Sequence, residues 1–337
     1  MNKKIIAIAI AAAMAAPAAM AEVTISGAFY GEIVNRSDDA NVMNPNSEAY
    51  VADDPATVAN EFVPGEATTA FEDGGKNTLA FTATSGNVYG KMGLDVGPGA
   101  GQTAGGAGTL KYRDFFIGYK FGDASVQFGT MSGAVKNLEK DPYIATFLQT
   151  RGTYAEARTS GAYGSSSYIS NVIQYKGKVG AGTLIAQYDP TADVNSSSNE
   201  GHMGVSYAGN ASGVGYFVGY NNGTGADVDG VDQTNMKLGA SMKFGTIKAG
   251  LMYTAADNDG TKWSAIALTA DMALGNGLSA NVGFGTTTGD VNEGTSYRVA
   301  VNKSLAKNAN LYAGVGSSTP DGGDAATVVG LGMGLKF

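Results

Sequence analysis

The sequence predicts an all-β chain that crosses a membrane as a closed antiparallel barrel of sixteen strands. Three observations predict this fold: side chains that alternate between apolar and polar, connectors that alternate between short and long, and no apolar run beyond the N-terminal segment that is long enough for a membrane helix. Glycine supplies 50 of 337 residues, about twice its usual share, and only 15% of residues are charged. This composition suits a sheet with one apolar face and one polar face.

The N-terminal segment, residues 1–21, has the pattern of a secretory signal peptide. Lys3 and Lys4 precede an apolar run, and small residues end that run at Ala21. A membrane-anchor helix is the alternative, but it needs about 20 apolar residues, more than this run offers. We therefore predict export and cleavage after Ala21, which leaves residues 22–337 as a single barrel domain.

Alternation with a period of two is clearest in residues 235–244, 266–274 and 278–284. In the first of these segments the apolar face consists of Met236, Leu238, Ala240, Met242 and Phe244. In a soluble sandwich this face would pack on a core, whereas in a membrane barrel it would face lipid. The segments match the roughly nine to eleven residues of a tilted membrane strand. They exceed the five or six residues or so that are usual in soluble proteins.

The connectors between these segments alternate between short and long. The short connectors are residues 85–87, 122–123, 210–213, 245–246 and 275–277. The longer, polar connectors are residues 36–75, 98–109, 131–166, 191–199, 222–233, 257–261, 287–294 and 319–324. Eight long connectors separate eight strand pairs, so the pattern predicts sixteen strands with both chain ends on the periplasmic side.

The sequence offers little for catalysis. The one histidine, His202, lies near Ser197 and Glu200, but proximity in sequence does not make a catalytic triad. There are 30 acidic and 22 basic residues, which argues against nucleic acid as a partner. We therefore predict that the chain is no enzyme and needs no cofactor.

Two acidic stretches, residues 227–232 and 257–260, have some features of calcium loops. Both lack the closing glutamate of the twelve-residue calcium loop, and such Asp-Gly clusters are also typical of hairpin connections. We predict no built metal site, although a looser divalent-ion bridge at the acidic rim stays open.

The last segment of the chain is the most diagnostic. Val329, Leu331, Met333, Leu335 and Phe337 alternate with glycine and lysine up to the aromatic C-terminus. Here the sequence resembles the Gram-negative general porin family. Further resemblances lie in residues 22–27, 113–122, 126–129 and 171–175.

The resemblance implies a trimeric sixteen-stranded channel of the outer membrane that passes small hydrophilic solutes and ions. It implies that the third loop, residues 131–166, folds into the lumen and narrows it. The charged residues that it implies at this constriction are Arg113, Glu139, Asp141, Glu156 and Arg158.

The same resemblance implies the partners. These are two further copies of the chain, outer-membrane lipid and lipopolysaccharide, and the barrel-assembly machinery, which would read the C-terminal Phe337.

The sequence departs from the family pattern in the basic residues expected on the channel wall. Thr78 and Tyr168 stand where the family often has arginine. The basic half of the constriction is therefore thin, and together with the negative net charge of −8 this predicts a weak preference for cations. Alternation also places Glu32 and Arg298 on the lumen face.

Arg113 poses a conflict between the family pattern and simple alternation. Strict alternation places it with Phe115 and Ile117 on the lipid side, at a cost of about 2 to 4 kcal/mol near the membrane midplane. A β-bulge near the start of this strand would turn it inward, and we favour that arrangement.

Three alternative functions stay open. The first is a substrate-selective channel of the same fold. The second is a surface adhesin or structural barrel with a plugged lumen, and the third is an exported soluble β-sandwich.

Overall fold

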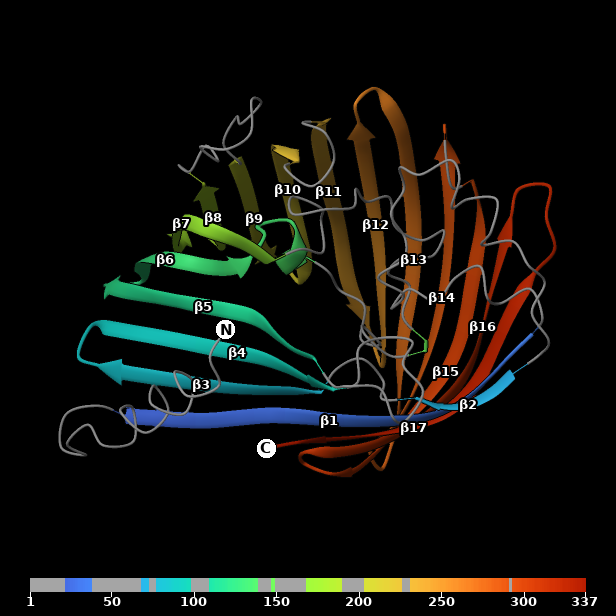
Figure 1. The fold of residues 1–337 in the computed structure, drawn as a ribbon. Coiled ribbons are helices and arrows are strands. Elements are labelled where there is room, and N and C mark those ends of the chain that lie inside the picture. Colours follow the sequence, from blue (N-terminus) through green and yellow to red (C-terminus); the bar gives the residue numbers. More distant parts are fainter. Residues whose placement is uncertain are drawn as a thin grey trace.

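The chain forms one antiparallel sheet that closes on itself as a barrel (Figure 1). The computed structural model describes residues 22–37, 68–72, 77–97, 109–138, 147–148, 168–189, 203–225, 231–290 and 293–337. The strands of the described residues are β1 (Glu22–Arg36), β2 (Thr68–Glu72), β3 (Thr78–Ser85), β4 (Val88–Gly97), β5 (Thr109–Phe121), β6 (Ala124–Ser132), β7 (Tyr168–Val179), β8 (Gly182–Tyr188), β9 (Met203–Ala211), β10 (Val214–Gly225), β11 (Val231–Phe244), β12 (Ile247–Asn258), β13 (Thr261–Gly275), β14 (Leu278–Gly289), β15 (Gly294–Ala306), β16 (Ala309–Pro320) and β17 (Ala326–Lys336). One 3-10 helix, η2 (Lys136–Leu138), follows β6.

These strands fill sixteen positions around the barrel. β1 pairs with β3 through Glu22–Ala28 and with β2 through Glu32–Arg36, so β2 and β3 share the second position. On its other edge β1 pairs with β17, and this pairing closes the barrel, as the blue and red strands of Figure 1 show. The predicted sixteen-stranded barrel is confirmed.

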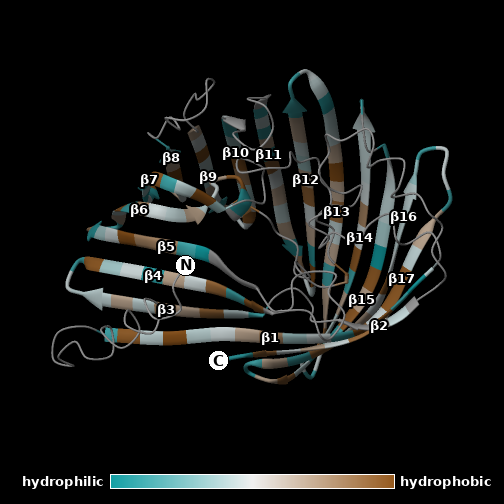
Figure 2. Ribbon diagram, in the orientation of Figure 1, coloured by the Kyte–Doolittle hydropathy of each residue, from teal (hydrophilic) through white to brown (hydrophobic). Residues whose placement is uncertain are grey.

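The two faces of the sheet differ sharply in polarity. Large apolar side chains on the outer face are widely exposed, with Ile33 at 53% and Ile117 at 58%, whereas the neighbouring Glu32 is 2% exposed. Figure 2 shows the resulting bands of hydrophobic and hydrophilic residues along the strands. Such an outer face is stable in lipid and not in water, so the soluble sandwich is wrong. Among the described residues no helix is long and apolar enough to cross a membrane.

At one end of the barrel, consecutive strands are joined by two-residue turns. Gly86 and Gly245 have φ values of 56° and 58° in two of them, a backbone conformation that glycine adopts without strain. At the other end, one predicted long loop, residues 257–261, is likewise a two-residue turn. Asp259 and Gly260 both have positive φ there, at 50° and 87°, as a tight Asp-Gly hairpin requires. The prediction of a long loop at this place was wrong, but the strand count is unaffected.

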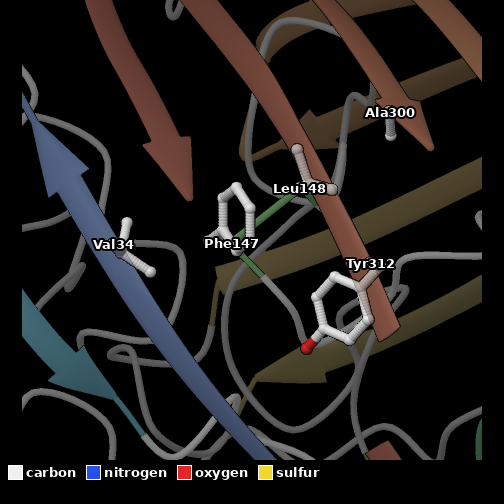
Figure 3. Packing of buried hydrophobic residues seen from close by; sticks show 5 residues of the cluster. All are labelled: Val34, Phe147, Leu148, Ala300 and Tyr312. Carbon is white, nitrogen blue, oxygen red and sulfur yellow. The ribbon is translucent and has the colours of Figure 1, made fainter. Parts of the chain in front are cut away.

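The buried apolar residues lie inside the barrel rather than between two sheets. One cluster joins Val34, Ala300 and Tyr312 of the wall with Phe147 and Leu148, which follow η2 in the chain (Figure 3). A second cluster joins Met131, Ile169 and Val172, with Phe116 packed against it.

Candidate channel constriction

The backbone of β5 carries a bulge at Arg113. Met92 pairs with Phe115 and Leu94 with Tyr112, so Arg113 and Asp114 together oppose the single residue Gly93. The extra residue resets the alternation, which allows Arg113 and Asp114 to share one face. The bulge thus resolves the conflict between alternation and the family pattern.

Arg113 belongs to a cluster of charged side chains on this wall. Its guanidinium forms an ion pair with Asp95 of β4 and lies 5.6 Å from the centre of the Tyr168 ring. The ammonium of Lys136 lies 4.8 Å from the same ring centre. Both distances are typical of cation–π contacts. Tyr168, which replaces a family arginine in sequence, therefore holds two cations at this wall.

A second ion pair adjoins the cluster. The ammonium of Lys91 on β4 lies 2.5 Å from a carboxylate oxygen of Asp114. Sequence reasoning missed Lys91, Asp95 and Asp114 as site residues. Alternation along β4 places Lys91 and Asp95 on one face. Their ion-pair partners, however, depend on the bulge in β5, and no feature of the sequence pattern indicates that bulge.

The residues that follow β6 pack against the inner face of β9 and β10. Ala134, Val135 and Leu138 are buried. The Cδ1 atom of Leu138 lies 2.5 Å from where a Cβ on Gly219 would be, so a side chain at this position would force Leu138 to shift. In addition, the amide of Gln187 donates to the carbonyl of Ser132 at 2.7 Å.

Gln187 is one member of a short row of amide side chains. Its Nε2 donates to Gln174 at 2.7 Å, and Gln174 in turn donates to Gln127. The three residues face one another across β6, β7 and β8. Through Gln187 the row contacts the backbone at Ser132, the last residue of β6 before the third connector.

Glu32 of β1 binds the backbone of the third connector. The amide of Phe147 donates to both carboxylate oxygens, at 3.3 and 3.2 Å, and the hydroxyl of Tyr312 donates to one of them at 2.5 Å. All three residues are buried. A carboxylate that is out of water is stabilised when it accepts such hydrogen bonds.

Arg298 of β15 binds the next residue. Its Nη1 donates to the carbonyl of Leu148 at 2.8 Å, and its Nε donates to Asn281 at 2.8 Å. Asn281 donates in turn to Asp271 at 2.5 Å. Consistent with the predicted lumen-facing positions, both Glu32 and Arg298 are almost fully buried.

Two glycines make room for the apolar side chains of the same connector. A Cβ on Gly330 would lie 3.0 Å from the Phe147 ring, and a Cβ on Gly314 would lie 2.9 Å from the Leu148 side chain. The short sequence Phe147–Leu148 is thus held both by polar partners of its backbone and by fitted apolar contacts.

The remaining predicted site residues cannot be placed. Glu139, Asp141, Glu156 and Arg158 lie outside the described residues, as does the predicted cleavage position at Ala21. Of the predicted constriction, the structure therefore places only Arg113. Among the described residues, no group of acidic or histidine side chains gathers closely enough to hold a metal ion.

A sixteen-stranded barrel with an apolar outer face and ionised inner side chains is the architecture of an outer-membrane channel. The sequence profile of the Gram-negative porins matches residues 7–323, so the chain belongs to that family and to the outer membrane. No curated protein sequence matches the chain.

Solved structures of similar fold support this assignment. The chain is similar to the anion-selective porin from Comamonas acidovorans, with 16% identity, a TM-score of 0.72 and coverage of 94% of this chain and 100% of that one. It is also similar to OmpF of Salmonella typhi in complex with daunomycin, with 15% identity, a TM-score of 0.64 and coverage of 94% and 97%. The trimer form of OmpT of Vibrio cholerae has 14% identity, a TM-score of 0.63 and coverage of 94% and 100%. At these identities the likeness concerns the fold.

Proposed function

We propose that the chain forms a water-filled diffusion channel for small hydrophilic solutes and ions and catalyses no reaction. The observation that carries this proposal is the closed barrel whose outer face is apolar and whose inner face holds ionised pairs such as Lys91–Asp114. Charged side chains on the inner face are costly in a dry interior and are normal along an aqueous path.

The third connector, in this proposal, folds into the lumen and narrows it. Leu138 packs at β10, and Phe147 is bonded to Glu32 on β1. β10 and β1 lie half a circumference apart in the strand order. These contacts on opposite walls support a connector that spans the lumen. Arg113, Glu139, Asp141, Glu156 and Arg158 would then line the narrowed path.

The channel in this proposal has a weak preference for cations over anions. The net charge of −8 favours cations, but the inner-wall acids Asp95 and Asp114 are each paired with a base. The basic cluster of Lys91, Arg113 and Lys136 is also fuller than the sequence alone indicated. The negative net charge and the basic cluster act in opposite directions, so the proposed preference for cations is weak. The similar Comamonas protein is anion-selective by its description.

The assembled form in this proposal is a homotrimer in contact with outer-membrane lipid and lipopolysaccharide. The solved trimer form of the similar Vibrio protein supports it. Delivery to the membrane would use the barrel-assembly machinery, which would recognise the last strand and Phe337.

Liposome swelling tests the proposed diffusion channel. Vesicles that contain the purified oligomer should swell in isotonic solutions of small sugars and amino acids, at rates that fall steeply with solute size. Gel migration before and after heating, in the same preparation, tests the trimer. Absence of swelling by intact heat-modifiable oligomer would contradict the channel and favour a plugged structural barrel.

A further inference from the structure

The inner wall of β10 to β14 carries a patch of uncharged polar residues around the only tryptophan of the chain. In strand register, Asn221 of β10 faces Asn235 of β11, and Asn235 faces Ala256 of β12. Ala256 faces Trp263 of β13, which faces Gly289 of β14. These residues form one continuous row across five strands.

Two further rows flank the first on the same face. On one side Gln233 of β11 faces Asn258 of β12. On the other side Thr254 faces Ala265, and Ala265 faces Thr287 of β14. Residues two apart on a strand share a face, so Asn258 and Thr287 lie in the neighbouring rows to Trp263.

Several polar atoms in this patch are buried and have no hydrogen-bond partner. Asn221 and Gln233 are each 1% exposed, and neither the amide nitrogen nor the amide oxygen of either side chain is paired. The hydroxyl of Thr287, 3% exposed, and the amide oxygen of Asn258 are unpaired as well. Buried polar groups are nearly always paired in native proteins, so a cluster of exceptions needs a cause.

Trp263 is surrounded by short side chains. It packs against Ala256 and Ala265, and its partner on β14 is Gly289. The alanine and glycine side chains around it are much shorter than the indole ring, so the ring extends further from the sheet than its neighbours. The indole is therefore the one large apolar group among the carboxamides and the hydroxyl of the patch.

We infer that this patch is a binding site for a neutral carbohydrate, an inference that rests on the proposed channel. Carboxamides and hydroxyls both donate and accept hydrogen bonds without charge, as the hydroxyls of a sugar require. An indole offers an apolar face for the C–H groups of a sugar ring. An ionic solute would need side chains of opposite charge, and within the three rows of described residues the only residue of a charged type is Lys237, which faces Thr254.

The patch lies towards the end of the barrel where the longer connectors are. Asn258 and Thr261 flank the Asp259–Gly260 turn at that end. In the proposed orientation this is the cell surface. A sugar would therefore meet the Trp263 patch before it reaches the constriction.

The intrinsic fluorescence of Trp263 tests the inference directly, because the chain has no other tryptophan. Purified oligomer in detergent is titrated with maltotriose, and with a polyethylene glycol of similar size as the control for crowding. We expect a saturable change in emission with maltotriose and none with the polymer. A response that is linear, or the same for both probes, would overturn the inference.

Two variants test whether maltotriose binds at this patch or elsewhere in the lumen. The double variant N221A/Q233A keeps Trp263, and we expect its half-saturating maltotriose concentration to rise about tenfold for the lost hydrogen bonds. The matched control is Gln127→Ala, which removes an inner-wall carboxamide of β6 that is already paired. Equal weakening in both variants would contradict a site at this patch.

Ion conductance of the same wild-type preparation distinguishes the two proposals. Conducting channels without a saturable fluorescence response would contradict the sugar site alone. Oligomers that do not conduct would contradict the proposed channel instead.

Discussion

Glu32 shows how one buried carboxylate organises the interior of the barrel. It accepts the hydroxyl of Tyr312 and the backbone amide of Phe147, two groups that lie 280 and 115 residues away in sequence. Both donors belong to buried residues, so the loss of this acceptor is costly. The contact therefore links the wall to the third connector at the level of single atoms.

Replacing Glu32 with alanine should loosen this link. The free energy of unfolding should fall by about 2 to 4 kcal/mol, because two buried donors lose their acceptor. Open-channel current noise should also rise as the Phe147 segment gains freedom. Urea titration in detergent and single-channel recording measure the two effects. Glu22→Ala, an exposed acid on the same strand, is the control, and an equal effect there would refute the role given to Glu32.

Replacing Arg113 with alanine should shift ion preference. The ion pair with Asp95 leaves an uncompensated carboxylate at the wall, so the permeability ratio of K⁺ to Cl⁻ should rise about twofold. Reversal potentials in a KCl gradient measure it. Arg113→Lys should retain most of the wild-type value, and Lys120→Ala, on the same strand, should shift it less. No shift in Arg113→Ala would place this residue outside the ion path.

Single residues were predictable where strict alternation holds and unpredictable where backbone geometry breaks it. Glu32 and Arg298 were assigned to the lumen because they lie in regular strands. Asp95 and Asp114 were missed because their pairing depends on the bulge opposite Gly93. The acids of the third connector, including Glu139, stay predictions from family resemblance.

At the scale of elements, β17 joins the end of the chain to its beginning. The backbone of Phe337 exchanges two hydrogen bonds with Gly27, at 2.9 and 3.1 Å, and its ring stacks on Phe29 at 5.5 Å. Any side chain at Gly27 would collide with the Phe337 ring, since a Cβ there would lie 2.5 Å from Cζ. The last residue therefore completes the seam between β17 and β1.

Deleting Phe337 should impair assembly more than conduction. The seam loses its terminal hydrogen bonds and the aromatic contact with Phe29, and the proposed signal to the assembly machinery is also lost. Quantitative blotting of outer-membrane fractions measures the yield. Lys336→Gln, which alters the exposed neighbour, should assemble normally. Wild-type yield after the deletion would contradict this role of the terminus.

The strands were predictable because lipid outside and water inside impose opposite polarity on successive residues. The connectors between the strands were less predictable. The turn at Asp259 and Gly260 is tighter than the polar stretch 257–261 indicated, because both residues adopt positive φ. The second strand position is shared by β2 and β3, and no feature of the sequence pattern marked that division.

At the scale of the whole molecule, the barrel combines an apolar outer face with an inner face that carries specific polar contacts. The interior is asymmetric: the ion pairs of Arg113 and Lys91 lie on β4 and β5, whereas the neutral patch around Trp263 lies on β10 to β14. Ions and neutral sugars would thus meet different walls of one lumen. This division is consistent with a weak charge preference despite the net charge of −8.

The central claim is that this barrel encloses a continuous aqueous path, and single-channel recording across a planar bilayer tests it most directly. The purified oligomer should insert with discrete current steps whose size rises in proportion to KCl concentration, and a KCl gradient should give a small reversal potential with the sign of a cation preference. A reversal potential of the opposite sign would overturn the preference alone. Insertion without any conductance would contradict the channel itself.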